Sequence, residues 1–173
     1  MLFRSKVGPK VYLREHGVVQ DTILTWPSIS ESFFSTLAKL LPGERAAVSA
    51  SLTKPTAVPA IVGCCVLVRA EALRDVGLFD ASFWSYVDEV DWDSRAHQAG
   101  WQRHYVPVES IVHLQKKNGY DFVSLTNYYI KRNTALWYAK NGKWFSMGIW
   151  MTITLAIAIV RAILAPLSGR SCS

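Results

Sequence analysis

The sequence predicts an α/β fold that is followed by a C-terminal hydrophobic helix. The stretch from Ile61 to Leu114 contains, in order, an apolar strand pattern, a helix pattern, an acidic cluster that opens a second helix, and a further strand pattern. Residues 144–167 then form the longest apolar run of the chain. With 173 residues, half of them hydrophobic, the chain is large enough to bury the core of one ordinary domain.

Residues 1–60 lead into this central stretch. Residues 7–21 alternate loosely and are punctuated by glycine and proline, which predicts short strands and a turn. Residues 28–41 begin with serines that can cap a helix and carry apolar side chains at helical spacing, so they predict a helix that ends at a Pro-Gly pair. Residues 44–59 are rich in Ala, Ser, Thr and Pro and predict an exposed loop.

The central stretch opens with a continuous apolar run at residues 61–68, which predicts a central strand covered on both faces. Gly63 lies inside this run, and a glycine within a strand often marks the close approach of a ligand or of another chain segment. Residues 69–76 predict a short helix that ends at a glycine.

An acidic cluster opens the next predicted helix, for which Ser85 or Asp88 is the expected cap. The free N–H groups and the dipole of a helix N-terminus favour carboxylates. Asp88 and Glu89 are therefore either ordinary first-turn acids or site residues at the end of a sheet, where open α/β sheets bind their ligands. Asp91 and Arg95 have the spacing of an ion pair along one helix face.

Two strands are predicted after this helix. The first covers residues 101–106 and is closed by Pro107, and the second is a short strand or loop at residues 111–113. The second can return toward the same edge of the sheet, which would bring His113 to the end of the sheet where the acidic cluster is expected.

The net charge of +6 comes entirely from the C-terminal part of the chain. Residues 1–121 contain 13 basic and 13 acidic residues, whereas residues 122–173 contain six basic residues and no acidic one. Basic residues next to a long apolar run favour contact with an anionic membrane surface. A nucleic-acid-binding protein would spread them over a folded face, so we expect no nucleic-acid partner.

The cysteines indicate a reducing compartment. Cys64, Cys65 and Cys172 have the spacing of neither a disulfide framework nor a zinc site. We expect reduced thiols in the cytosol, with Cys64 and Cys65 as small residues packed in a strand.

The C-terminal segment, residues 122–173, is predicted to be helical. Residues 121–140 form one helix, an Asn-Gly pair breaks it, and the apolar run of residues 144–167 forms another. The run is nearly long enough to span a bilayer but is interrupted by Arg161. Three alternatives remain open: a helix in the membrane plane, a spanning helix with a snorkelling Arg161, or an amphipathic helix that packs on the catalytic part.

A long ordered series of residues runs from Gly63 to His113. It consists of G-x-C-x-L-V-R-x-E-A-L-x-x-V-G-x-F-D, then F-x-x-Y, an acidic pair followed by x-D-W-x-x-R, then A-G-W, Y-V-P and V-H. The series resembles the inverting family 2 glycosyltransferases, and is most similar to the rhamnosyltransferase-like members that build bacterial cell-surface polysaccharides. The strong match covers about a third of the chain.

The resemblance implies the second, acceptor-side half of a GT-A fold. It also implies a nucleotide-diphosphate sugar as donor, a glycan or lipid-linked acceptor, and a divalent metal, Mn²⁺ or Mg²⁺. Glu89 takes the position of the general base, because inverting transfer needs a carboxylate within reach of the acceptor hydroxyl. Asp88 is the other member of the catalytic pair, and His113 takes the position of a metal ligand. The further substrate contacts that we predict are Gly63, Cys64, Trp92 and Arg132.

We therefore expect a partial family 2 glycosyltransferase at the cytoplasmic face of a bacterial membrane. Residues 1–60 are the lead-in of the GT-A domain, residues 61–121 its base-bearing half, and residues 122–173 a membrane-associated helical segment. Because residues 1–60 contain no Asp-x-Asp motif and are too few for the donor-binding βαβ units, we expect the donor-binding half to be missing. The alternative is a non-catalytic remnant or a membrane-associated interaction module.

Overall fold

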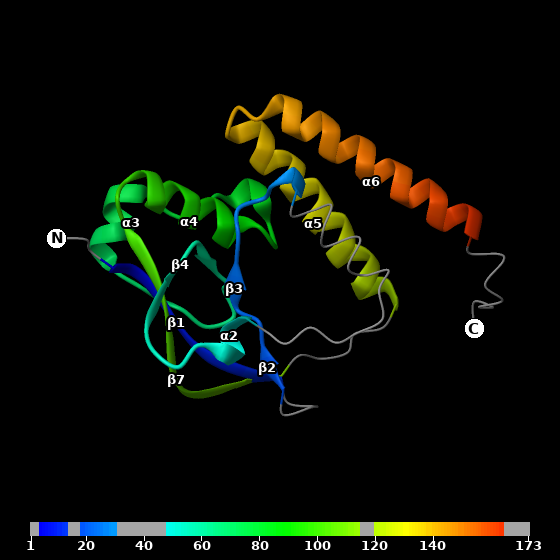
Figure 1. Cartoon of the computed structure of the whole chain (residues 1–173). Coiled ribbons are helices and arrows are strands. Elements are labelled where there is room, and N and C mark those ends of the chain that lie inside the picture. The colour runs from blue at the N-terminus through cyan, green and yellow to red at the C-terminus, as the bar shows by residue number, and fades with distance from the viewer. Residues whose placement is uncertain (1–3, 14–17, 31–47, 115–119, 165–173) are drawn as a thin grey trace. The chain divides into compact units, whose positions relative to one another are not determined.

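The computed structural model describes residues 4–13, 18–30, 48–114 and 120–164 (Figure 1). The chain forms two compact units, of which the first contains Met1–Trp26 and Pro42–Asn133 and the second contains Pro27–Leu41 and Thr134–Ser173. The first unit combines helices with a sheet, and the described part of the second is helical. The prediction of an α/β fold is confirmed at this level.

The elements have the following bounds. The strands are β1 (Arg4–Leu13), β2 (Val19–Gln20), β3 (Ile23–Leu24), β4 (Thr56–Val58), β5 (Ala60–Ile61), β6 (Leu67–Val68) and β7 (Gln102–His113). The helices are α2 (Val48–Ser51), α3 (Ala70–Val76), the 3-10 helix η1 (Ala81–Phe83), α4 (Asp88–Gln98), α5 (Tyr120–Lys140) and α6 (Trp144–Leu164).

The main sheet is built on β1 and β7, which run parallel and side by side (Figure 1). The strand order is β2-β1-β7-β4, and β6 pairs antiparallel with β1. β7 is one strand where the sequence predicted two. Pro107 does not end it, because the pairing with β1 shifts between Val106 and Ile111 and resumes up to His113. Such an irregularity accommodates a residue that cannot donate to the ladder.

The prediction of a central strand at residues 61–68 is wrong. The segment contains the end of β5, which pairs with β3, and the whole of β6, which pairs with β1. Residues 62–66 lie between them without strand structure, so Cys64 is exposed and Cys65 half-buried. The expected packing of the two cysteines inside a strand is therefore also wrong, although both are free thiols as predicted.

Gly8 of β1 allows residues 61–65 to lie close against this strand, because glycine has no Cβ atom. A Cβ atom on Gly8 would lie 2.6 Å from Cγ2 of Ile61 and 3.4 Å from the carbonyl oxygen of Cys65. Ile61 is itself buried, in a core cluster with Val58 and Tyr105. The close approach that the sequence analysis attributed to Gly63 thus occurs at Gly8.

The lead-in differs in part from its prediction. The loop expected at residues 44–59 contains α2 and β4, of which β4 pairs with β7 through Thr56 and Tyr105. Of the helix predicted over residues 28–41, only Ser28, Ile29 and Ser30 are described, and Ile29 and Ser30 are helical. The remainder of that prediction lies outside the described residues.

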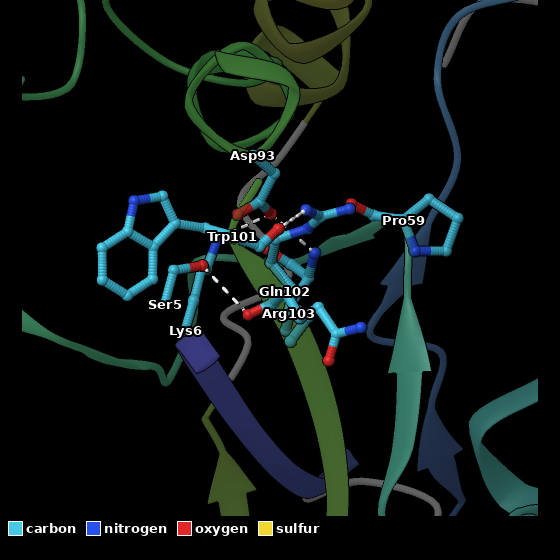
Figure 2. A network of polar contacts seen from close by, with 8 residues as sticks. Ser5, Lys6, Pro59, Asp93, Trp101, Gln102 and Arg103 are labelled. Atoms are coloured by element: carbon cyan, nitrogen blue, oxygen red, sulfur yellow. Dashed lines mark hydrogen bonds and ion pairs between the residues drawn. The ribbon is translucent and has the colours of Figure 1, made fainter. Parts of the chain in front are cut away.

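A buried ion pair joins β1 to α4, and the sequence analysis missed it (Figure 2). The Lys6 ammonium lies 2.9 Å from Oδ2 of Asp93, and neither side chain is exposed to solvent. Lys6 also donates to the carbonyl oxygen of Ile61 at 2.9 Å, and the same Asp93 oxygen accepts from the N–H of Ile61 at 2.9 Å. Burial raises the pKa of Asp93, and the charge of Lys6 offsets part of this rise.

The described part of the second unit is a helical hairpin. The C-terminal part of α5 ends near Gly142, which has φ +67°, and α6 follows. Trp137 and Tyr138 are buried, and the ring of Tyr138 lies 6.4 Å from that of Trp150 on α6. Within the described ranges, no helix reaches the length and apolar character needed to cross a membrane.

Candidate active site

Glu89 lies in the first turn of α4, where its side chain is half-buried. Burial raises the pKa of this carboxyl group to about 7, and the hydrogen bond and charge of the neighbouring Asp88 add to the rise, whereas Lys6 opposes it. A carboxyl group that titrates near neutral pH is suited to accept a proton as a general base. The predicted base role of Glu89 is untested, but its environment is compatible with that role.

The backbone just before α4 is strained. Trp84, Tyr86 and Val87 have φ values of 58°, 65° and 70°, in the left-handed region that side chains other than glycine rarely adopt. Each such residue costs on the order of 1 to 2 kcal/mol. The N-cap is Val87, without a side-chain cap bond, so the predicted caps Ser85 and Asp88 are wrong. Strain of this kind is concentrated at functional sites, where the surrounding structure maintains it.

Asn133 of α5 holds this strained loop. Its side chain is fully buried, and its amide nitrogen donates to the carbonyl oxygens of Phe83, Ser85 and Tyr86 at 2.5, 2.7 and 2.8 Å. The sequence analysis assigned no role to Asn133. The sequence does not show whether the amide of an asparagine is buried. Helix periodicity indicates which residues share a face, but it does not identify the distant segment that packs on that face.

Arg132 is exposed and donates through Nη1 to the carbonyl oxygen of Ser82 at 2.9 Å and to Oδ1 of Asn133 at 2.6 Å. The side chain therefore lies at the same loop as Asn133. The predicted contact of Arg132 with a diphosphate stays a prediction, and its observed contacts are structural.

The turn of residues 62–66 lies close enough to Glu89 for the two to interact electrostatically. Although Cys64 as a residue is exposed, partial desolvation of its thiol is the main cause that raises the thiol pKa, and the charges of Cys65 and Glu89 raise it further. Such a thiol is a poor nucleophile, since the thiolate is the reactive form. No described atom lies within 4 Å of the position that a Cβ on Gly63 would take. Gly63 thus has open space next to its Cα atom, and the contact of Gly63 and Cys64 with substrate stays a prediction.

Trp92 lies in the core of the first unit and is fully buried. Its indole N–H donates to the carbonyl oxygen of Gly77 at 2.8 Å, and its ring is stacked on that of Phe79 at 5.7 Å. This position gives Trp92 a packing role, and the prediction that it contacts substrate gains no support from it.

The predicted pair of Asp91 and Arg95 is confirmed, with Nε of Arg95 2.9 Å from Oδ2 of Asp91. Arg95 also donates to the carbonyl oxygens of Val76 and Leu78 at 2.8 and 2.9 Å. The pair therefore fixes the chain between α3 and η1 to α4, as a structural rather than a catalytic feature.

His113 lies at the end of β7, where its Nδ1 is 2.8 Å from Oε1 of Gln20 on β2. In the part of the chain that the structure describes, no hydrogen bond or ion pair joins His113 to α4. Nor do three His, Cys, Asp or Glu side chains come together there as a metal site would require. The described residues therefore do not by themselves fit the expected divalent metal, and the metal role of His113 stays a prediction.

A pocket of about 300 Å³ lies at the other end of α4, away from Glu89. It is lined by Trp26, Ala57, Val58, Pro59, His97, Trp101, Gln102 and Arg103. The guanidinium of Arg103 lies 5.4 Å from the centre of the Trp26 ring and is fixed by bonds to the carbonyl oxygens of Pro59 and Trp101 (Figure 2). Because none of the predicted site residues lines this pocket, it is not part of the candidate active site.

Two curated proteins, from two strains of Mycobacterium tuberculosis, are similar to this chain. Both are described as N-acetylglucosaminyl-diphospho-decaprenol L-rhamnosyltransferase and are 41% identical to it over 51 residues. The matched segment is 30% of this chain and 17% of each relative. No family model matches the sequence, and no solved structure is significantly similar to it. The partial similarity to these relatives supports a relationship of this chain to glycosyltransferases in general.

Proposed function

We propose that this chain provides the acceptor side of an inverting family 2 glycosyltransferase, with Glu89 as the general base. The observation that carries the proposal is the half-buried carboxyl group of Glu89, whose pKa is raised to about 7 at the strained start of α4. The partial similarity to a rhamnosyltransferase supports the reaction class.

The proposed reaction is a single displacement. The deprotonated Glu89 accepts the proton of the acceptor hydroxyl while the hydroxyl oxygen forms a bond to the anomeric carbon of the donor sugar. The bond between that carbon and the diphosphate oxygen breaks, and the nucleoside diphosphate leaves with the bonding electrons. Attack from the face opposite the leaving group inverts the anomeric configuration. Asp88 acts through Glu89, because its charge and hydrogen bond keep the pKa of Glu89 high.

The relatives suggest the substrates. We propose nucleotide-activated L-rhamnose as the donor and a polyprenyl-diphospho-N-acetylglucosamine as the acceptor, following the names of the similar proteins. We also propose a requirement for Mn²⁺ or Mg²⁺. His113 is its one expected ligand in this chain, so no step of the reaction above is assigned to the metal.

We further propose that α6 lies on the cytoplasmic face of the membrane that holds such a lipid-linked acceptor. Phe145, Leu155 and Ile163 of α6 are 82%, 62% and 63% exposed, which is unusual for large apolar side chains. Lys140 and Lys143 next to this helix are exposed, and the sequence has no acidic residue after position 121. An anionic bilayer surface complements both the apolar helix and its basic flank.

A transfer assay tests the proposed reaction. The intact protein is incubated with a nucleotide-activated sugar, a polyprenyl-diphospho-N-acetylglucosamine and Mn²⁺ or Mg²⁺, and the glycolipid is identified by mass spectrometry. We expect transfer that stops when the metal is chelated, and NMR of the product should show an inverted anomeric configuration. A retained configuration would contradict the mechanism. Absence of transfer from every donor tried, with membrane binding preserved, would favour the alternative of a non-catalytic, membrane-associated module.

A further inference from the structure

We propose that Asn133 is a positioning residue, which holds the strained loop of residues 84–87 and through it sets the direction of Glu89 into the acceptor site. The inference rests on the proposed function in one respect, namely that Glu89 is the base. The contacts of Asn133 themselves do not depend on that function.

Asn133 uses both ends of its side-chain amide in hydrogen bonds. One amide group has two hydrogens, and here they are shared among the three carbonyl oxygens of Phe83, Ser85 and Tyr86. Three acceptors on one side fix the orientation of the amide, and the Arg132 guanidinium donates to its Oδ1 at 2.6 Å. The buried amide thus satisfies the last carbonyl group of η1 and two carbonyl groups of the loop of residues 84–87, which has no regular secondary structure.

These hydrogen bonds maintain a strained backbone in the loop of residues 84–87. Trp84, Tyr86 and Val87 have positive φ values, and β-branched Val87 is the least suited to that conformation. Such a backbone persists only where the surroundings determine it. α5 supplies those surroundings from 40 to 50 residues further along the chain, through Asn133 and through a 3.0 Å bond between Thr126 and the hydroxyl of Tyr86.

The loop of residues 84–87 is directly continuous with the first turn of α4, which contains Glu89. Val87 is the N-cap of α4, and its carbonyl oxygen accepts the bond from the Asp91 N–H at 2.8 Å that closes the first turn. Glu89 lies within that turn. A shift of the loop therefore rotates the first turn and changes how far the Glu89 carboxyl group is buried beside Asp88, Lys6 and Cys64.

The experiment compares Asn133→Asp with Asn141→Asp in the full chain. The first variant keeps the side-chain shape but faces three carbonyl oxygens with a carboxylate oxygen. The second makes the same change at an amide just after the end of α5, which donates to the carbonyl oxygen of Trp137 at 2.8 Å. NMR measures hydrogen exchange at the Asp91 amide and the titration of the Glu89 carboxyl group, which Glu89→Gln identifies.

In Asn133→Asp we expect exchange at Asp91 to accelerate by about tenfold or more, because the first turn opens locally. The midpoint of the Glu89 titration should fall from about 7 toward its ordinary value of 4.5. Exchange at Ile61, whose amide is bonded to Asp93 in the core, should stay unchanged, as should all three readouts in Asn141→Asp. Wild-type exchange and titration in a folded Asn133→Asp protein would overturn the proposal.

If Asn133→Asp does not fold, Arg132→Met gives the second measurement. This exposed residue loses its bonds to Ser82 and Asn133 without a buried charge being created. We expect the same changes at Asp91 and Glu89 in smaller size, and their absence would overturn the proposal. The transfer rate of Glu89→Gln separates the two ideas. Retained turnover would refute the base while leaving the effect of Asn133 on the loop intact.

Discussion

The carboxyl group of Glu89 shows which of two opposing effects dominates at the start of α4. A helix N-terminus stabilises a carboxylate by roughly 0.3 to 1 kcal/mol and should lower its pKa. The pKa is instead raised from 4.5 to about 7, with burial as the largest cause and Asp88 as the next. A rise of this size corresponds to about 3 kcal/mol, so burial and the second carboxyl group outweigh the helix end.

This balance predicts how stability depends on pH. The folded state binds the Glu89 proton more tightly than the unfolded state, so its contribution is complete below pH 4.5 and is lost as the pH rises through about 7. Glu89→Gln removes that dependence. Between pH 5 and 7.5 the stability of the wild type should fall relative to the variant by on the order of 2 kcal/mol, measured by urea unfolding. Parallel pH profiles of the two proteins would contradict the raised pKa.

Gly8 and Gly63 differ in the space around their Cα atoms, and substitution by alanine should therefore affect them differently. Gly8→Ala places a Cβ atom 2.6 Å from the buried Ile61, so we expect the free energy of unfolding to fall by about 1 to 3 kcal/mol. Gly63→Ala meets no described atom and should change stability by less than about 0.5 kcal/mol. In the intact enzyme, however, Gly63→Ala should raise the KM for a substrate. An equal loss of stability in both variants would show that residues 62–66 pack more closely than described here.

Side-chain contacts between residues that are close in the sequence could be predicted, whereas contacts between distant residues could not. The pair of Asp91 and Arg95 follows from a spacing of four residues on one helix, and the structure confirms it. The pair of Lys6 and Asp93 is separated by 87 positions, and no pattern along the chain identifies it. The same holds for Asn133, whose partners lie 47 to 50 positions away.

At the scale of elements, Asp93 fixes the position of α4 on the sheets. Its carboxylate contacts Lys6 of β1 and the N–H of Ile61 in β5. Lys6→Met leaves the Asp93 carboxylate buried with the N–H of Ile61 as a donor and removes the donor to the Ile61 carbonyl oxygen. We expect a loss of about 3 to 5 kcal/mol in the free energy of unfolding.

Lys10→Met is the matched control, because Lys10 lies on the same strand and is half-buried. It should change stability by less than about 0.5 kcal/mol. Equal effects of the two substitutions in thermal or urea unfolding would show that the ion pair does not hold α4 against the sheet.

Helices were predicted better than strands, for a physical reason. α3, α4 and α5 follow from periodicity and from glycines at their ends, which are local signals. The segment of residues 61–68 has the composition of one buried strand, but its two ends pair with different partners, β3 and β1. Strand pairing is set by distant segments, so an apolar run alone does not determine whether a strand continues.

At the scale of the whole molecule, the proposed contact of α6 with a membrane is supported by the basic charge next to the helix and by its exposed apolar side chains. Flotation of the full chain with vesicles that contain anionic lipid tests this. The variant Phe145→Glu, Leu155→Glu should lose binding, because each buried apolar side chain contributes about 1.5 to 3 kcal/mol. Val108→Glu changes an exposed apolar residue on β7 and should float as the wild type does. Equal flotation of both variants, or none of the wild type, would contradict the proposed contact.

The proposed function assigns the general base of a glycosyl transfer to Glu89. The most direct measurement is the transfer rate of Glu89→Gln in the intact protein, together with its affinity for the nucleotide-activated sugar by calorimetry. We expect turnover to fall by about 10²-fold or more, because the amide cannot accept the acceptor proton. Donor affinity should remain nearly intact, because Glu89 acts on the acceptor side. Turnover close to that of the wild type would contradict the account and assign the base to another residue.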